Sequence, residues 1–180
     1  MSKSTSTWYT PPYLHSMVRR VLKTSNIYDP CPVEDDVKED GLKQDWGLHP
    51  FIYCNPPIPA AIWAYKALET AERHNNESVI MFAAFSPSVL FQEPRLLDYP
   101  ICFCRKRIKW IDGRKMILGK AQLIDNELVI QEKPNPNFGK GIVGSTAYSA
   151  FVLLGANTEY VARFKSVFES IGKVTSGFKP

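Results

Sequence analysis

The fold is decided by residues 51–85, FIYCNPPIPAAIWAYKALETAERHNNESVIMFAAF, where two apolar runs flank a helical pattern. The first run, Phe51–Cys54, predicts a strand, and Pro59 with the alanine-rich segment after it predicts a helix to about His74. Residues 78–85 are apolar on both faces, which is typical of a central parallel strand. Because short links join strand, helix and strand, the sequence predicts a βαβ unit and an α/β fold with a mostly parallel sheet.

Further elements are expected on both sides of this unit. Apolar residues at helical spacing predict a helix at Pro12–Leu22, and a short strand is expected at Ile27–Tyr28. After the unit we expect strands at 101–104, 107–111 and 149–154, a hairpin over 121–130, and a helix over 158–171 capped by Gly172. Residues 133–143 are rich in Pro, Asn, Gly and Lys and predict a mobile loop.

Composition bounds the class of protein. The chain has 180 residues, of which 44% are hydrophobic, and this predicts one globular domain. The net charge of +4 is compatible with a polyanionic partner. No apolar run is long enough to span a bilayer, so we expect no membrane partner. The four cysteines form no CxxC pair, so we expect no metal site, and we expect free thiols in a reducing cytoplasm.

The most informative motif is Asn55-Pro56-Pro57, which ends the first strand abruptly because proline cannot donate a ladder hydrogen bond. The Asn55 side chain and the Pro56 carbonyl can then both face outward as acceptors, a pair suited to an exocyclic amino group such as that of adenine or cytosine. Asn before Pro also occurs in ordinary turns. However, Asp29-Pro30-Cys31 follows the preceding strand, so both segments are expected at the sheet edge where ligands bind.

The order of such segments along the chain carries a resemblance. The segments are Trp8-Tyr9-Thr10-Pro11-Pro12, Asp29-Pro30-Cys31, Asp40-Gly41-Leu42 with Trp46, Asn55-Pro56-Pro57, and Phe103 to Trp110. In this order the chain resembles the phage-type DNA N6-adenine methyltransferases from Trp8 to about Gly155. The arrangement is similar to the gamma class of S-adenosylmethionine-dependent amino-methyltransferases.

The resemblance implies a single methyltransferase domain over residues 1–180, with an abbreviated Rossmann-like fold and a mostly parallel central sheet flanked by helices. It implies a cofactor-binding set made up of Trp8, Tyr9, Thr10, Pro11, Asp29, Pro30, Cys31 and Asp40. Within this set, Thr10 and Pro11 would contact the methionine portion of S-adenosylmethionine, and Asp40 would lie near its adenine. The alternative for Thr10 is a simple helix cap.

The catalytic segment implied by the resemblance is Asn55, Pro56, Pro57 and Ile58, of which Asn55 and Pro56 would hold the target amino group. The family usually has an aromatic residue, which stacks on the extruded base, where this chain has Ile58. Such stacking is worth about 1–3 kcal/mol per base, and Trp63 or Tyr53 is a candidate to replace it. A glycine-rich turn is also missing after Tyr28. Both departures favour the alternative of a catalytically silent DNA-binding relative.

The predicted partner is double-stranded DNA. Its phosphates are expected to contact a basic set, Arg105, Lys106, Arg107, Lys109, Arg114, Lys115 and Lys140, within a DNA-contacting hairpin and loop insertion at 105–145. A solvated hairpin face is the alternative.

The predicted activity is methyl transfer from S-adenosylmethionine to adenine N6 with base flipping. The same acceptor pair also fits cytosine N4 or an RNA amine. A cytosine-C5 mechanism with Cys31 as nucleophile would need an activated thiolate and would leave Asn-Pro-Pro without a role.

Overall fold

The computed structural model describes residues 8–32, 40–74, 78–84, 86–113, 116–124, 127–142 and 148–177, with the backbone alone at 116–132 and 142. Its helices are α1 (Pro12–Leu22), η1 (Trp46–Leu48), α2 (Ala60–Arg73), α3 (Ser88–Gln92), η2 (Pro94–Asp98) and α4 (Thr158–Phe168). Its strands are β1 (Trp8–Tyr9), β2 (Phe51–Cys54), β3 (Val79–Ala84), β4 (Ile101–Cys104), β5 (Trp110–Asp112), β6 (Met116–Ile124), β7 (Glu127–Pro134), β8 (Gly141–Ile142), β9 (Ala150–Leu154) and β10 (Gly172–Thr175).

The central sheet is mixed and mostly antiparallel, with the strand order β10-β4-β9-β3-β2. Strands β2 and β3 are parallel, as the βαβ pattern predicts, and Tyr28 adds a parallel bridge to Ile52 outside β2. The pairs β3–β9, β9–β4 and β4–β10 are antiparallel. The prediction of a Rossmann-like, mostly parallel sheet is therefore wrong.

The antiparallel half has a simple geometric cause. The chain leaves the sheet at the end of β4 and returns to the same edge before β9, where the Cys104 amide donates to the Ser149 carbonyl at 3.1 Å. A strand that starts at the edge where the previous one ended must run in the opposite direction. Strand β9 therefore lies antiparallel between β3 and β4, although β4 itself runs in the same direction as β3.

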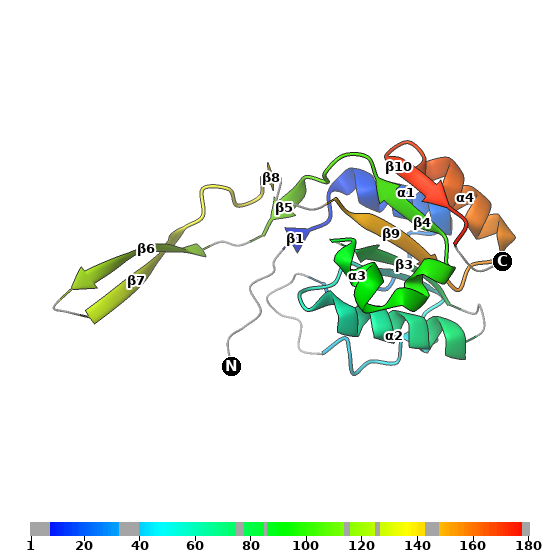
Figure 1. The fold of residues 1–180 in the computed structure, drawn as a ribbon, viewed down its shortest axis with the longest axis horizontal. Coiled ribbons are helices and arrows are strands. Elements are labelled where there is room, and N and C mark those ends of the chain that lie inside the picture. The colour runs from blue at the N-terminus through cyan, green and yellow to red at the C-terminus, as the bar shows by residue number, and fades with distance from the viewer. Residues whose placement is uncertain are drawn as a thin grey trace.

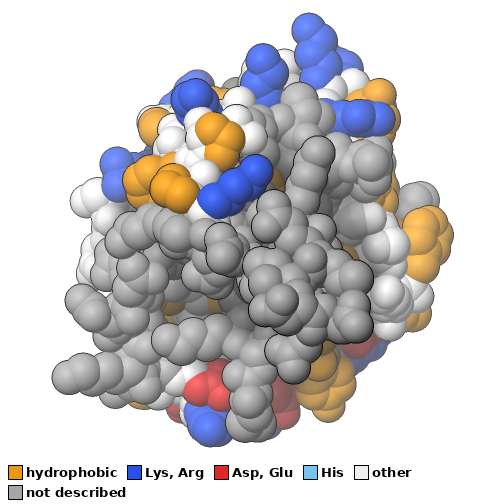
Figure 2. Space-filling model, turned by 90° about the vertical axis from the view of Figure 1, so that its left-hand side faces the viewer, with side chains coloured by type: hydrophobic (Ala, Val, Ile, Leu, Met, Phe, Trp, Pro, Cys, Tyr) orange, Lys and Arg blue, Asp and Glu red, His pale blue; other side chains and the backbone are white. Residues whose placement is uncertain are grey.

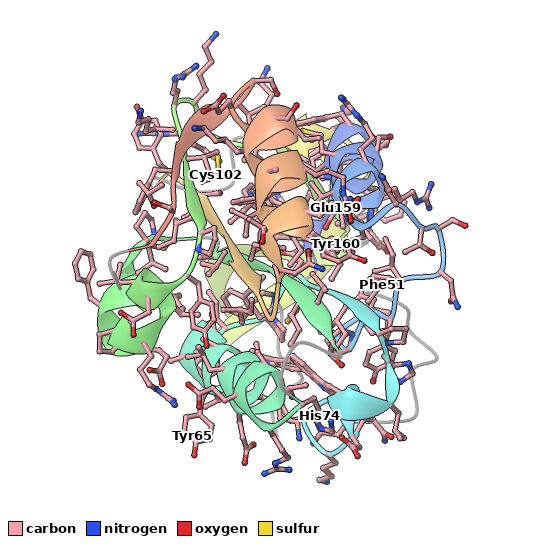
Figure 3. The ribbon with its side chains drawn as sticks, turned by 90° about the vertical axis from the view of Figure 1, so that its right-hand side faces the viewer. Phe51, Tyr65, His74, Cys102, Glu159 and Tyr160 are labelled. Carbon is pink, nitrogen blue, oxygen red and sulfur yellow. The ribbon has the colours of Figure 1, made fainter. Side chains whose placement is uncertain are left out.

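Helices cover both faces of the sheet (Figures 1 and 3). Helices α1 and α4 pack on one face and helices α2 and α3 on the other, which divides the core into two apolar clusters. Strand β2 alternates between them, so that Tyr53 faces α1 whereas Ile52 and Cys54 face α2. On the α4 side, the Phe51 ring lies 6.2 Å from the Tyr160 ring (Figure 3).

A second small sheet, β1-β5-β8, lies beside the central one, and the β6–β7 hairpin projects from it away from the body (Figure 1). The loop predicted at 133–143 is shorter among the described residues, where it covers 135–140 between β7 and β8. Strand β7 extends to Pro134, and the Gly139 amide donates to the Asp112 carbonyl at 2.8 Å. Gly139 has a φ of 72°, which suits glycine in this turn before β8.

The remaining local predictions divide into confirmed and corrected elements. Helix α1 and strand β2 have the predicted bounds. Helix α4 ends at Phe168, and Gly172 begins strand β10, so the predicted helix to Ile171 with a glycine cap is wrong. Within the described residues, no helix has the length and apolar character required to cross a membrane.

Candidate functional site

The carboxyl end of β2 meets the turn that follows Tyr28. The Cys31 thiol donates to the Asn55 carbonyl at 3.2 Å, and the Cys31 and Cys54 sulfurs lie 3.8 Å apart. The Asp29 carboxylate accepts the Cys31 amide at 3.0 Å, which closes an Asx turn. The Tyr28–Ile52 bridge explains this meeting, because parallel neighbours end at the same edge.

The Asn55 side chain has a defined orientation. Its amide nitrogen donates to the Trp8 carbonyl oxygen at 3.1 Å. A backbone carbonyl can only accept, so the nitrogen must face Trp8 and the carboxamide oxygen must point the other way. Among the residues that the structure describes, no hydrogen bond to this oxygen is found. The half-buried Asn55 therefore presents an acceptor at the sheet edge.

Thr10 is buried against Tyr53. The two hydroxyl oxygens lie 3.1 Å apart, and burial raises the pKa of Tyr53, which keeps the phenol neutral. The cap of α1 is Pro11, with no side-chain hydrogen bond, so the alternative of Thr10 as helix cap is wrong. The His15 ring meets the Tyr53 ring edge-on at 5.6 Å, and burial lowers the pKa of His15.

The Asp40 turn lies against the turn at Asp29. A Cβ added to Gly41 would lie 1.7 Å from the Pro30 carbonyl oxygen, so the two backbones are in close contact. The Trp46 indole nitrogen donates to the Gly41 carbonyl at 2.7 Å and fixes the turn. Asp40 itself is exposed and accepts the Leu42 amide at 3.1 Å.

The two carboxylates near the edge differ in environment. Asp40 is exposed, whereas Asp29 is half-buried. Burial raises the pKa of Asp29, and the hydrogen bonds from Cys31 partly oppose this increase. A cation bound near this turn would relieve the cost of holding the Asp29 charge.

The structure thus brings four predicted segments together: residues 8–10, 29–31, 40–41 and 54–55. The exposure of the predicted catalytic segment, residues 55–58, changes along its length. Pro56 is buried and Pro57 half-buried, whereas Ile58 is 71% exposed.

Neither proposed substitute for the missing aromatic residue is available in this arrangement. Trp63 is 7% exposed and packs near Trp46, with ring centroids 6.2 Å apart. Tyr53 is 2% exposed. Because both rings are packed in the core, the structure argues against base stacking on either one.

The basic segment lies on the same edge but not in contact with Asn55. Arg105, Lys106, Arg107 and Lys109 are exposed and follow β4. In the strand order, β4 is separated from β2 by three interstrand steps, or about 14 Å. Figure 2 faces this side of the molecule, where Lys and Arg side chains gather in the upper part of the view. Lys140 is exposed in the turn beside Asp112, and Arg114 and Lys115 lie outside the described residues.

An exposed aromatic residue adjoins this basic segment. The Arg107 guanidinium lies over the Tyr148 ring, 5.9 Å from its centroid, and Tyr148 is 49% exposed. Tyr148 precedes β9, which places it between the basic segment and β3 on the sheet edge.

Sequence reasoning missed two of these features, the contact between Tyr53 and Thr10 and the position of Tyr148 beside Arg107. The alternation of a strand puts Tyr53 and Asn55 on one face, and this signal could have linked Tyr53 to the site. Tyr148 gave no such signal, because its place depends on the antiparallel return of the chain.

The site combines an oriented amide acceptor, two carboxylates and a basic edge. Within the described parts of the chain, no group of three or more His, Cys, Asp or Glu side chains is placed to hold a metal ion. No family model, curated protein or solved structure matches this chain.

Proposed function

We propose that this protein is an S-adenosylmethionine-dependent methyltransferase that acts on adenine N6 in DNA. One observation carries the proposal: the hydrogen bond from the Asn55 nitrogen to Trp8 turns the carboxamide oxygen outward at the carboxyl end of β2. An acceptor held in this way suits an exocyclic amino group. The proposal does not depend on a Rossmann-like sheet, because the site is built where Tyr28 forms a parallel bridge to β2.

The proposed role of Asn55 is to stabilise the positive charge that develops on adenine N6 during methyl transfer. The adenine N6 lone pair is delocalised into the ring and is a weak nucleophile. When the Asn55 oxygen and the Pro56 carbonyl accept the N6 hydrogens, they favour a tetrahedral nitrogen and disperse the positive charge that develops on it. When bound, S-adenosylmethionine supplies the methyl carbon, so the protein's own residues provide alignment and electrostatics.

The residues around Asn55 fit a cationic ligand. S-adenosylmethionine carries a sulfonium and an ammonium group, and Asp29 and Asp40 supply two carboxylates in contacting turns. Partial burial raises the pKa of Asp29, and a positively charged ligand beside it would favour its ionised form. Thr10 and Pro11 adjoin the site through Tyr53 and Trp8. We assign Thr10, Pro11, Asp29 and Asp40 to cofactor binding.

The nucleic-acid side is assigned to the basic edge. The exposed cations at 105–109 suit backbone phosphates. Tyr148 has the exposed ring that Ile58 lacks, and stacking on such rings is worth about 1–3 kcal/mol per base. We therefore assign Tyr148 to contact with an unpaired base near the target.

The test is transfer of a labelled methyl group to unmethylated DNA, followed by nucleoside analysis. Asn55→Ala is expected to lower kcat about 100- to 1,000-fold, the usual cost of one preorganised polar group. The matched control is Asn26→Ala, at an exposed asparagine outside the site, which should retain full activity. Methylation of cytosine N4 or of RNA would redirect the substrate assignment, and an unchanged Asn55→Ala rate would refute the mechanism.

A second candidate is a catalytically silent DNA-binding relative. The exposed Ile58 and the buried Trp63 and Tyr53 favour it, because none of them supplies a stacking ring. Calorimetry with S-adenosylmethionine separates the two candidates. If the protein binds DNA but shows no heat of binding with millimolar S-adenosylmethionine, the silent relative is the correct candidate.

A further inference from the structure

Cys31 and Cys54 form a close pair of thiols at the candidate site. Their sulfurs lie 3.8 Å apart, at the ends of the two neighbouring parallel segments. The sulfurs of a disulfide lie about 2.05 Å apart, so the gap is closed by a shift of less than about 2 Å. Both residues are free cysteines in this structure.

We propose that Cys31 and Cys54 are a peroxide-sensitive dithiol that converts reversibly to a disulfide. The Cys31 sulfur attacks a peroxide oxygen, the O–O bond breaks, and one water leaves as Cys31 becomes a sulfenic acid. The Cys54 sulfur then attacks the Cys31 sulfur, the S–O bond breaks, and the Cys54 proton leaves with the hydroxide as a second water. The two thiols lose two electrons in all, and the peroxide gains them.

The environments of the two thiols explain why Cys31 is oxidised first and Cys54 reacts second. Cys31 is half-buried and reachable from solvent, whereas Cys54 is fully buried. Burial also raises the pKa of Cys54 well above its usual value, which keeps that thiol protonated and unreactive toward solvent oxidants. Cys54 reacts only with a partner already beside it, and a sulfenic acid on Cys31 is such a partner.

Oxidation would change the surroundings of Asn55 directly. The Cys31 thiol hydrogen now bonds the Asn55 carbonyl at 3.2 Å, and a disulfide has no such hydrogen. The Cys31–Cys54 disulfide would also join the Asp29 turn covalently to the end of β2. Its effect on catalysis rests on the proposed function, whereas formation of the disulfide does not.

The experiment treats the reduced full-length protein with hydrogen peroxide, blocks remaining thiols, and digests with trypsin for mass spectrometry. Cleavage after Lys and Arg puts Cys31 in the peptide 24–38 and Cys54 in the peptide 44–66. We expect these two peptides to be joined, with a loss of about 2 Da that a dithiol reductant reverses. Cys31→Ser should abolish the link, and Cys104→Ser, in a buried pair with Cys102, should retain it.

The possible results separate cleanly. A linked 24–38 and 44–66 pair supports the dithiol. A sulfinic acid on Cys31 without a link, a loss of 2 Da confined to the peptide 96–105 that holds Cys102 and Cys104, or no change at all would each overturn it. A link in a protein that never methylates DNA leaves the dithiol intact and counts against the proposed function alone.

Discussion

Asn55 and Trp8 are joined by a hydrogen bond of 3.1 Å between residues 47 positions apart in the chain. The bond connects the segment after β2 to the strand β1, which pairs with β5 at the root of the projecting hairpin. The orientation of the candidate catalytic amide therefore depends on how the N-terminal segment docks.

Replacement of Asn55 by aspartate tests this orientation. In Asn55→Asp a carboxylate oxygen would face the Trp8 carbonyl, and two acceptors cannot form a hydrogen bond. We expect loss of activity together with about 1–3 kcal/mol of unfolding free energy, measured in urea. Asn26→Asp is the control and should leave both quantities unchanged. A stable and active Asn55→Asp would show that the Trp8 contact has no role.

The buried contact between the Thr10 and Tyr53 hydroxyls predicts that mutations of these two residues have non-additive effects on the free energy of unfolding. Tyr53→Phe and Thr10→Val each leave one buried hydroxyl without its partner, at an expected cost of about 1–3 kcal/mol. The double variant removes both hydroxyls and should cost less than the sum of the single variants. Urea unfolding of the four proteins measures the coupling. Strict additivity would contradict the contact.

Gly41 is expected to tolerate no side chain. An added Cβ would lie 1.7 Å from the Pro30 carbonyl oxygen, so Gly41→Ala must push the two turns apart. We expect a loss of about 1–3 kcal/mol in stability and weaker cofactor binding by calorimetry. Gly141→Ala is the matched control, because its nearest neighbour lies at an ordinary 3.6 Å. Equal effects of the two changes would argue against the close approach.

Asp29 predicts a pH dependence with a definite sign. Its pKa is raised by burial in the folded state, so the folded protein binds more protons than the unfolded chain between the two pKa values. The neutral carboxyl stabilises the folded protein fully when the pH is below the pKa of Asp29 in the unfolded chain. This stabilisation is lost as the pH rises through the pKa of Asp29 in the folded protein. Asp29→Asn keeps the acceptor for the Cys31 amide but cannot titrate. Its unfolding free energy should fall less between pH 4 and 7, and parallel curves would refute the effect.

The basic edge predicts a change in salt dependence. If Arg107 contacts a phosphate, Arg107→Ala should reduce the slope of log K against log salt for duplex DNA by about 1. Tyr148→Ala should weaken binding to a flipped-base analogue with little change in slope. Arg73→Ala, at the end of α2 on the opposite edge, is the control. Fluorescence anisotropy across sodium chloride concentrations measures all three.

Local elements were predictable where one periodicity dominates. The helix at Pro12–Leu22 and the strand at Phe51–Cys54 follow from apolar spacing, and the parallel β2–β3 pair follows from the βαβ pattern. The direction of β9 was not predictable in this way, because it depends on where the chain re-enters the sheet after residue 148. The Asn55–Trp8 bond has the same character, since no local pattern links residues so far apart.

The outer margin of β2 has a consequence for self-association. Exposed sheet margins recruit strands from other molecules and seed aggregates. Here the Tyr28 amide bonds the Phe51 carbonyl at 2.9 Å and the Tyr53 amide bonds the Tyr28 carbonyl at 3.0 Å, so a single residue shields the strand. Beyond Cys54, Pro56 and Pro57 offer no N–H to an incoming chain. We therefore expect the prolines that end β2 also to disfavour pairing of this edge with strands of other molecules.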